Sequence, residues 1–505
     1  MKPLYSLSSP GIRRAVFISA LGLAISLAAA MPASAQGVFR QLSQDSFTDP
    51  SAQHMTEVEP GAFSSGPMVV TAFQVARISG GGGDDVGWAT SRDGALTWTN
   101  GVLPGLTTYG GGGGTNSAAS DASVAYDAKH GVWLICTLPI GSTGDNVAVS
   151  RSTDGIHWGN PIYISRDGGD DKNWIMCDDT STSPYYGNCY AGWDTPLVQM
   201  STSSDGGLTW GAAKATAAFD YGIGVNPVVQ PNGTVIVGFA DYNGGMSAFT
   251  STNGGQSWNA AVSISTAPSH GEAGNLRSAG LPSSAIDGAG KVYVSWPDCR
   301  FESGCAANDI VYSTSTDGIH WSSVVRVPID PINSGVDHFI HGMGIDIRSS
   351  GGSAFMAITY YYYPVSACGS NCQLYAGFTL SHDGGQTWTA GRQLSTAMQL
   401  SWLPNTFSGR MVADYVATVF PWGGFSARSR ALPIYVIAHA PAGGLFQQAV
   451  YTESFGITSD EMTEPRMSSK DDRPIPGAKS DHPARRPEDR DNELPVRPGT
   501  TPPVR

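Results

Sequence analysis

Arginine and acidic residues lie just ahead of several predicted strands, where their side chains can converge on one site. Arg277 and Arg410 each immediately precede a predicted strand, and so does Asp121. A guanidinium fork binds a carboxylate through two parallel hydrogen bonds, and two acidic groups that flank a glycosidic bond can hydrolyse it. These residue types indicate a site for an acidic sugar, provided that the fold brings the strand ends together.

Six copies of one short motif mark the elements that would position these residues. The pattern is Ser-x-Asp-Gly-Gly-x-Thr-Trp or a near variant, and the copies end at Trp98, Trp158, Trp210, Trp258, Trp321 and Trp388. The Asp can accept hydrogen bonds from the amides of its own turn, the Gly supplies a positive φ, and the Trp fills the apolar side of a hairpin. We expect these motifs to be structural turns and not ligand sites.

The regular spacing of the motifs predicts an all-β fold. Copies that recur every 48 to 67 residues indicate a β-propeller of four-stranded antiparallel blades. Three predicted strands follow the sixth motif without a fourth, and residues 38–43 resemble the strand that leaves that motif. Seven blades, closed by pairing of the N- and C-terminal strands, are therefore favoured over six, because closure removes free sheet edges.

Composition divides the chain into three parts. Residues 1–35 carry Lys2, Arg13 and Arg14 ahead of an apolar run and a small-residue cleavage site, which predicts a Sec-type signal peptide and a secreted protein, extracellular or periplasmic. The apolar run is short for a membrane anchor, so we expect no membrane span after cleavage. Residues 36–455 are the predicted propeller. Residues 456–505 are rich in Pro, Arg and Asp, which predicts a disordered tail.

The seven cysteines form three sequence-local pairs with one residue left over. The pairs are Cys177 with Cys189, Cys299 with Cys305, and Cys368 with Cys372, which leaves Cys136 as a buried free thiol. An exported protein favours disulfides, and the alternative of a metal site lacks any Cys-x-x-Cys pair. We therefore expect three disulfides and no metal bound by cysteine.

Charge and composition also limit the partners. The chain has 29 Lys and Arg residues against 42 Asp and Glu residues, which disfavours a nucleic-acid partner. We expect a monomer without a cofactor, and the sequence does not reveal whether a structural Ca²⁺ ion is bound.

The motif repeat resembles the sialidase superfamily of Asp-box propellers, over roughly residues 36–454. In that superfamily the motifs lie away from the active face, three Arg surround the substrate carboxylate, a Tyr and a Glu form the nucleophile pair, and an Asp is the acid/base. The resemblance implies candidate catalytic residues Asp121, Glu59, Glu272 and Tyr361, and candidate substrate-binding residues Arg277, Arg300, Arg410 and His338. Glu57-Val58-Glu59-Pro60 stands where sialidases place Phe-Arg-Ile-Pro or Tyr-Arg-Ile-Pro.

Structural roles stay open for several of these candidates. Arg300 can instead pair with its neighbour Asp298 and tie a loop together. Glu59 can be an exposed carboxylate on an alternating strand. The ring of Tyr361 can pack in the core, and His338 can bond to loop backbone.

These features lead to one favoured functional hypothesis and two alternatives. The favoured hypothesis is a secreted sialidase-like glycoside hydrolase that cleaves a terminal or exposed acidic sugar of a glycan by a retaining mechanism. The alternatives are a non-catalytic propeller that binds a glycan or a protein, and a polysaccharide lyase. Convergence of Asp121, a Glu and at least two Arg in one pit would favour hydrolysis, and their scatter around a rim would favour binding.

Overall fold

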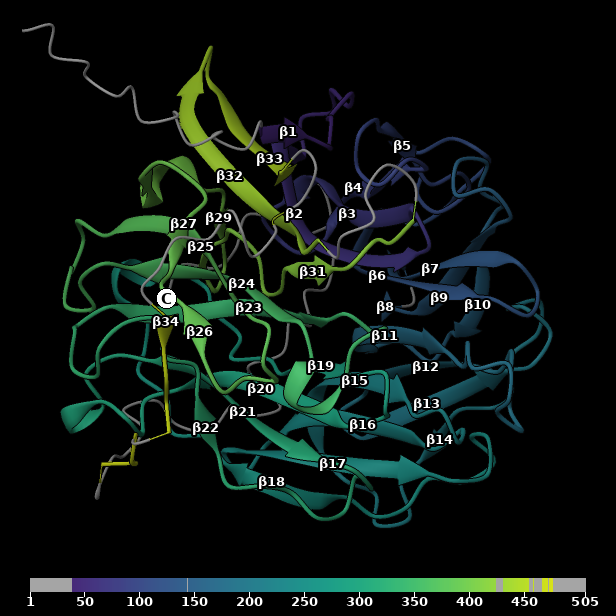
Figure 1. Cartoon of the computed structure of the whole chain (residues 1–505). Helices are drawn as coiled ribbons and strands as arrows, with labels where there is room; N and C mark the ends of the chain where they lie inside the picture. The colour runs from purple at the N-terminus through teal and green to yellow at the C-terminus, as the bar shows by residue number, and fades with distance from the viewer. Residues whose placement is uncertain are drawn as a thin grey trace, which may run out of the picture. The chain divides into compact units, whose positions relative to one another are not determined.

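The computed structural model describes residues 39–142, 144–423, 430–453, 457, 466–470 and 472–475. Among these residues the regular structure consists of β-strands and four short 3-10 turns, so the all-β prediction is confirmed (Figure 1). The turns are η1 (Ala273–Asn275), η2 (Ser303–Cys305), η3 (Gly351–Ser353) and η4 (Leu400–Trp402). The predicted signal peptide lies outside the described residues. In the part of the chain described, no helix has the length and apolar character to cross a membrane.

Thirteen strands form one large sheet. Its order is β10 (Ile162–Ser165), β9 (Val147–Ser152), β7 (Val132–Gly141), β6 (Ala118–Asp127), β4 (Gly83–Ser91), β3 (Met68–Ile78), β2 (Ala52–Ser65), β33 (Leu445–Glu453), β32 (Leu432–Ala442) and β31 (Ala417–Val419). Three short strands add to it, β1 (Phe39–Gln41) on β33, β5 (Thr99–Val102) on β4 and β8 (Gly144–Asp145) on β7.

The remaining strands form smaller sheets. Three have four strands each: β11 (Asp171–Cys177), β12 (Cys189–Asp194), β13 (Val198–Ser203) and β14 (Lys214–Ala215); β15 (Gly222–Val229), β16 (Val235–Asp241), β17 (Gly245–Ser251) and β18 (Val262–Thr266); β19 (Ser283–Ile286), β20 (Val292–Asp298), β21 (Asp309–Ser315) and β22 (Val325–Arg326). A five-stranded sheet holds β23 (Asp337–Ile345), β24 (Met356–Tyr363), β25 (Gln373–Ser381), β27 (Arg392–Gln393) and β28 (Met398–Gln399). Two ribbons pair β26 (Trp388–Thr389) with β34 (Arg466–Met467) and β29 (Asn405–Thr406) with β30 (Gly409–Arg410).

The predicted seven-bladed propeller, like its six-bladed alternative, is wrong. The described strands form one large mixed sheet and several small ones, and none of these sheets closes into a barrel or a propeller. The large sheet crosses the boundaries that the motif spacing predicts between blades. At two of these boundaries the strands pair through one residue pair, Gly83 with Ala119 and Thr56 with Gln448. The motif encodes hairpins through local hydrogen bonds, and it carries no information on how neighbouring sheets join.

The expected pairing of the segment at residues 38–43 with the strands after the sixth motif is confirmed for residues 39–41. β1 runs antiparallel to β33, with Phe39 opposite Glu453 and Gln41 opposite Tyr451. β33 and β32 form a long hairpin next to β2 (Figure 1). The two ends of the chain's β-structure therefore stabilise each other.

The six motif turns have the same hydrogen bonds, as predicted. In each, the Ser hydroxyl donates to the Asp or Asn two residues later, at 2.8 to 3.1 Å. The same side-chain oxygen accepts a backbone amide further along the turn, at 2.8 to 3.0 Å. Each Asp or Asn is thus satisfied within its own turn, which confirms the structural role.

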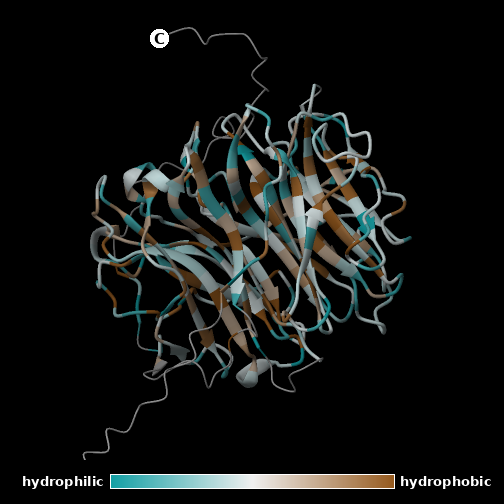
Figure 2. Cartoon of the chain, turned by 90° about the horizontal axis from the view of Figure 1, so that it is seen from above, coloured by the Kyte–Doolittle hydropathy of each residue, from teal (hydrophilic) through white to brown (hydrophobic). Residues whose placement is uncertain are grey.

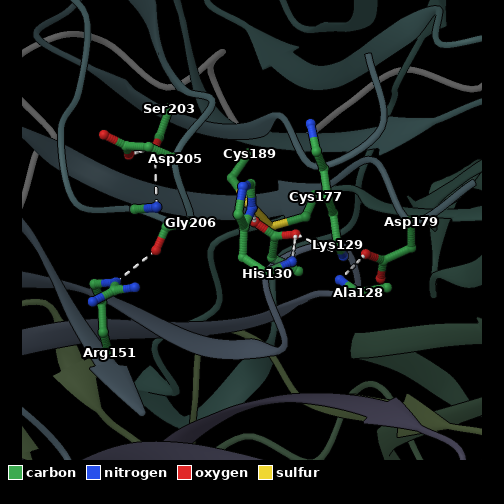
Figure 3. The surroundings of a disulfide bond; sticks show 12 residues. Ala128, Lys129, His130, Arg151, Cys177, Asp179, Cys189, Ser203, Asp205 and Gly206 are labelled. Atoms are coloured by element: carbon green, nitrogen blue, oxygen red, sulfur yellow. Dashed lines mark hydrogen bonds and ion pairs between the residues drawn. A yellow bond between two sulfur atoms is a disulfide. The ribbon is translucent and has the colours of Figure 1, made fainter. Parts of the chain in front are cut away.

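Three disulfides form as the sequence predicts, and Cys136 is a buried free thiol. Cys177–Cys189 joins β11 to β12 (Figure 3). Nearby, the Asp179 side chain accepts the amide of Ala128 at 2.8 Å, and Arg151 donates to the carbonyl of Gly206 at 2.5 Å (Figure 3). These contacts link the sheet of β11 to the strands before it.

Apolar residues are concentrated on the strands (Figure 2). Residues of β2, β11, β15, β19, β23 and β31 line one cavity of about 200 Å³. The first strands of several sheets therefore face a common space, and the ends of these strands can present side chains to one site.

Two described stretches of the predicted tail contact the rest of the chain. β34 pairs with β26, and Ile475 donates its amide to the carbonyl of Arg300 at 2.7 Å. Asp472 lies 3.5 Å from Arg326. Short polar and backbone contacts hold these residues against the sheets, and the rest of the predicted tail beyond them and Ile457 lies outside the described residues.

Candidate functional site

Three charged residues lie on β-bulges at similar positions in three strands, β2, β6 and β11. Glu59 on β2, Asp121 on β6 and Lys172 on β11 have φ values of 56°, 47° and 45°. Each lies where the pairing register of its strand shifts. A bulge bends the strand and redirects a side chain. The three bulges direct these side chains toward one another.

The ammonium group of Lys172 is the centre of this cluster. Its Nζ lies 3.6 Å from Glu59 Oε1 and 3.5 Å from Asp121 Oδ1. Asp121 also accepts the Lys172 backbone amide at 3.1 Å and the Ser120 hydroxyl at 3.0 Å. Gln74 donates to both Glu59 and Ser120. A short network therefore holds both carboxylates in place.

Asp414 connects this cluster to Arg277. Lys172 Nζ donates to Asp414 Oδ2 at 2.7 Å. Arg277 donates from Nε to Oδ1 at 2.9 Å and from Nη2 to Oδ2 at 2.6 Å, which is the bidentate geometry of a strong ion pair. Asp121, Glu59 and Arg277 come together through two residues outside the prediction, Lys172 and Asp414. One candidate arginine joins this cluster, so the convergence that would favour hydrolysis is met in part.

Burial changes the proton affinity of Glu59. Loss of solvent, with the charges of Asp414 and Asp121, raises the pKa of Glu59 well above its usual range, although Lys172 opposes the shift. The upward shift in the pKa of Glu59 favours its protonated form, which suits a proton donor.

An open cleft lies beside the cluster. Its volume is about 770 Å³, and it lies between the turn that joins β16 to β17 and the segment that leads into β19. Arg277 and Glu272 line it, together with His270 and Tyr242. Lys172 instead lines the cavity of about 200 Å³, so Asp414 lies between the two spaces.

The other two predicted arginines lie elsewhere. Arg300 forms a bidentate pair with Asp298, at 2.8 and 2.7 Å, as the structural alternative predicted. Arg410 donates from Nη1 to the carbonyl of Leu403 at 2.9 Å. Its own carbonyl accepts the Arg277 amide at 2.8 Å, so Arg410 supports Arg277 through backbone.

Tyr361 and His338 are also outside the cluster. The buried Tyr361 hydroxyl donates to the carbonyl of Val436 and accepts its amide, both at 2.8 Å, and burial raises the pKa of Tyr361. His338 is buried beside Tyr360 and Tyr362, and burial lowers its pKa. Both residues pack in the interior, and Glu272 lines the cleft together with Arg277.

Lys172 and Asp414 are the members that sequence reasoning missed. Asp414 stands just before β31, as Asp121 stands near the start of β6, and this placement was a usable signal. Lys172 gave no such signal, because a left-handed backbone at a Lys is rare and no local pattern marks it.

No family model and no curated protein matches the sequence. Among solved structures, a Hadza microbial sialidase aligns at 13% identity over 81% of this chain and 67% of its own, with a TM-score of 0.41. A protein of unknown function from Dyadobacter fermentans aligns at 14% identity over 68% of this chain and 99% of its own, with a TM-score of 0.43. An intramolecular trans-sialidase from Ruminococcus gnavus aligns at 13% identity over 82% and 97%, with a TM-score of 0.40. These likenesses assign neither a family nor an activity to the chain.

Proposed function

We propose that the protein is a secreted glycoside hydrolase that cleaves a terminal or exposed acidic sugar of a glycan. The observation that carries this proposal is the convergence of Glu59 and Asp121 on one ammonium group, Lys172 Nζ. Hydrolysis of a glycosidic bond needs a protonated acid near the leaving oxygen and a carboxylate near the anomeric carbon. The cluster offers both groups at one place.

The two carboxyl groups have different tasks in this proposal. Glu59, whose pKa is raised by burial, donates its proton to the leaving oxygen. The Asp121 carboxylate opposes the positive charge that develops on the sugar ring as the glycosidic bond breaks. Water then adds to the anomeric carbon and returns a proton to Glu59. This assignment gives the proton transfer to Glu59, whereas the family resemblance gave it to Asp121.

The cations account for the preference for an acidic sugar. Arg277 lines the cleft and Lys172 lines the cavity, on either side of Asp414. A sugar carboxylate that enters the cleft would meet the Arg277 guanidinium, in a lining that also includes Asp241 and Glu272. The partner class is therefore a glycan with an acidic residue.

A glycan-binding protein without turnover is the second candidate, and burial of the carboxylates favours it. Glu59 is 0% exposed and Asp121 is 2% exposed, and neither lines the cleft. Catalysis needs the substrate to displace part of the covering segments, whereas binding in the cleft does not. The cluster would then serve only to hold the strand ends together.

Incubation of the secreted protein with aryl glycosides of sialic, uronic and deoxy sugars separates the two candidates. The hydrolase predicts release of the aryl alcohol from at least one acidic glycoside. It also predicts a loss of roughly 10²-fold or more in kcat for Asp121→Asn, with KM nearly unchanged. Binding of the glycosides without release by the wild type would support the second candidate.

A further inference from the structure

A loop ahead of β2 is organised around three polar side chains. Asp45 accepts the amides of Phe47 at 2.8 Å and Met55 at 2.7 Å, and Met55 has a φ of 60°. Asp49 Oδ1 accepts the amide of Ser51 at 3.0 Å. His54 lies between the two, with Nδ1 at 3.0 Å from Asp45 Oδ2 and Nε2 at 2.5 Å from the carbonyl of Asp49.

Asp84, at the start of β4, faces this loop. One ligand atom from each of Asp49, His54 and Asp84 lies within 4.8 Å of the others. Asp84 is 0% exposed, and neither of its carboxylate oxygens accepts a hydrogen bond from any described donor. Asp49 Oδ2 is buried and likewise accepts none from the described residues. The two carboxyl groups lie within hydrogen-bond distance of each other, and burial with the Asp49 contact raises the pKa of Asp84 to about 9. No other described side chain donates to Asp84.

The chemistry of the open oxygens defines the ligand. Buried carboxylates without donors are costly unless a cation compensates them. Both nitrogens of His54 already contact Asp45 and the Asp49 carbonyl, so the open groups are carboxylate oxygens. Oxygen-only donor sets with flexible geometry suit Ca²⁺, which completes its shell with water or carbonyls.

We propose that Asp49 and Asp84 bind a Ca²⁺ ion that ties the loop before β2 to the start of β4. The proposal does not depend on hydrolysis, because the pair is separate from the Lys172 cluster.

A second acidic group, on other sheets, has a cation beside it. Asp309, Asp330 and His338 also lie within 4.8 Å of one another. Arg326 is already present there, at 2.7 Å from Asp309 and 3.0 Å from Asp330. Arg326 is the cation of that group, and Asp330 therefore offers a matched control.

Thermal melting of the full chain tests the site, with EDTA in one sample and 1 mM CaCl₂ in the other. The wild type is expected to melt roughly 3 °C or more higher in CaCl₂. Asp84→Asn and Asp49→Asn should lose this rise, and Asp330→Asn should keep it. In EDTA, Asp84→Asn should melt no lower than the wild type, since a neutral amide replaces an uncompensated carboxylate. Titration calorimetry with CaCl₂ should lose one strong site in both variants.

Two results would overturn the proposal. One is a wild type with the same melting temperature in EDTA and CaCl₂ and no heat of Ca²⁺ binding, which would leave Asp49 and Asp84 as an acid pair that shares a proton. The other is an Asp84→Asn variant that folds and keeps the full rise with CaCl₂, as does Asp49→Asn.

Discussion

At the scale of single residues, Glu59, Asp121 and Lys172 hold left-handed backbone conformations that L side chains seldom adopt. Such conformations cost of order 1–3 kcal/mol each and cluster at functional sites. Here they coincide with a buried set of three carboxylates and two cations, itself costly to bury. Strain and charge coincide at one place, and this coincidence supports the proposed catalytic role.

Arg277→Lys tests the ion pair that links the cleft to the cluster. Lys cannot reproduce the two hydrogen bonds to Asp414, so part of a buried carboxylate loses its partner. We expect a loss of about 1–3 kcal/mol in the free energy of unfolding, measured by denaturant titration. Arg348→Lys is the control, because Arg348 makes the same fork to Asp346 with a side chain that is 37% exposed. Equal losses in the two variants would refute the special role of Arg277.

Part of this site was predictable from residue type and position. Asp121 and Arg277 were expected just ahead of strands, and an arginine beside a carboxylate pair suggests acidic-sugar chemistry. The structure places Asp121 within β6 and Arg277 ahead of β19. Tyr361 and His338 matched the same pattern and proved to be interior residues, because alternation on a strand does not reveal which ring finds a backbone partner. Lys172 could not be predicted from the sequence, because its role depends on a β-bulge.

At the scale of elements, Glu57 on β2 connects three segments. Its Oε2 accepts the Ser43 hydroxyl at 2.7 Å, and Ser43 Oγ accepts the amide of Val450 on β33 at 2.8 Å. Burial raises the pKa of Glu57 to about 8, with a further contribution from Asp45. The folded state thus binds a proton that the unfolded state releases above its ordinary pKa of 4.5.

This difference sets the sign of a pH dependence. The stability contributed by the protonated Glu57 is complete below about pH 4.5 and falls as the pH rises toward 8. Glu57→Gln removes the titration, so the variant should gain on the wild type by up to about 1.4 kcal/mol per pH unit in this window. Denaturant titrations from pH 5 to 8 measure the gain. A constant difference between the two proteins across this range would contradict the assignment.

At the scale of the whole molecule, the pairing of the N-terminal strand β1 with β33 could be predicted from the sequence. The joining of strands into one large open sheet could not. The sequence has three predicted strands without a fourth after the sixth motif, and a similar segment near its start. In the structure β1 pairs with β33. The way neighbouring sheets join depends on single residue pairs such as Thr56 with Gln448, which no repeat pattern encodes.

Leu42 and Phe39 provide a matched test of this terminal pairing. Leu42 is 1% exposed and donates its amide to the carbonyl of Val450 at 2.8 Å, whereas Phe39 is 47% exposed. Leu42→Ala should cost about 2–5 kcal/mol through the cavity it leaves, and Phe39→Ala should cost much less. The melting temperatures of the two variants test this expected difference in stability. Similar small shifts would show that the N-terminal segment adds little to the fold.

The central claim, that Glu59 is the proton donor of a glycoside hydrolase, is tested most directly by leaving-group dependence. The measurement is kcat for wild type and Glu59→Gln on two aryl glycosides of the same acidic sugar, one with an acidic phenol and one with a weakly acidic phenol. A phenol that leaves as a stable anion needs no proton. We predict a loss of roughly 10²-fold or more for the weakly acidic phenol and a much smaller loss for the acidic one. Equal losses on both substrates, or full activity on both, would contradict the account.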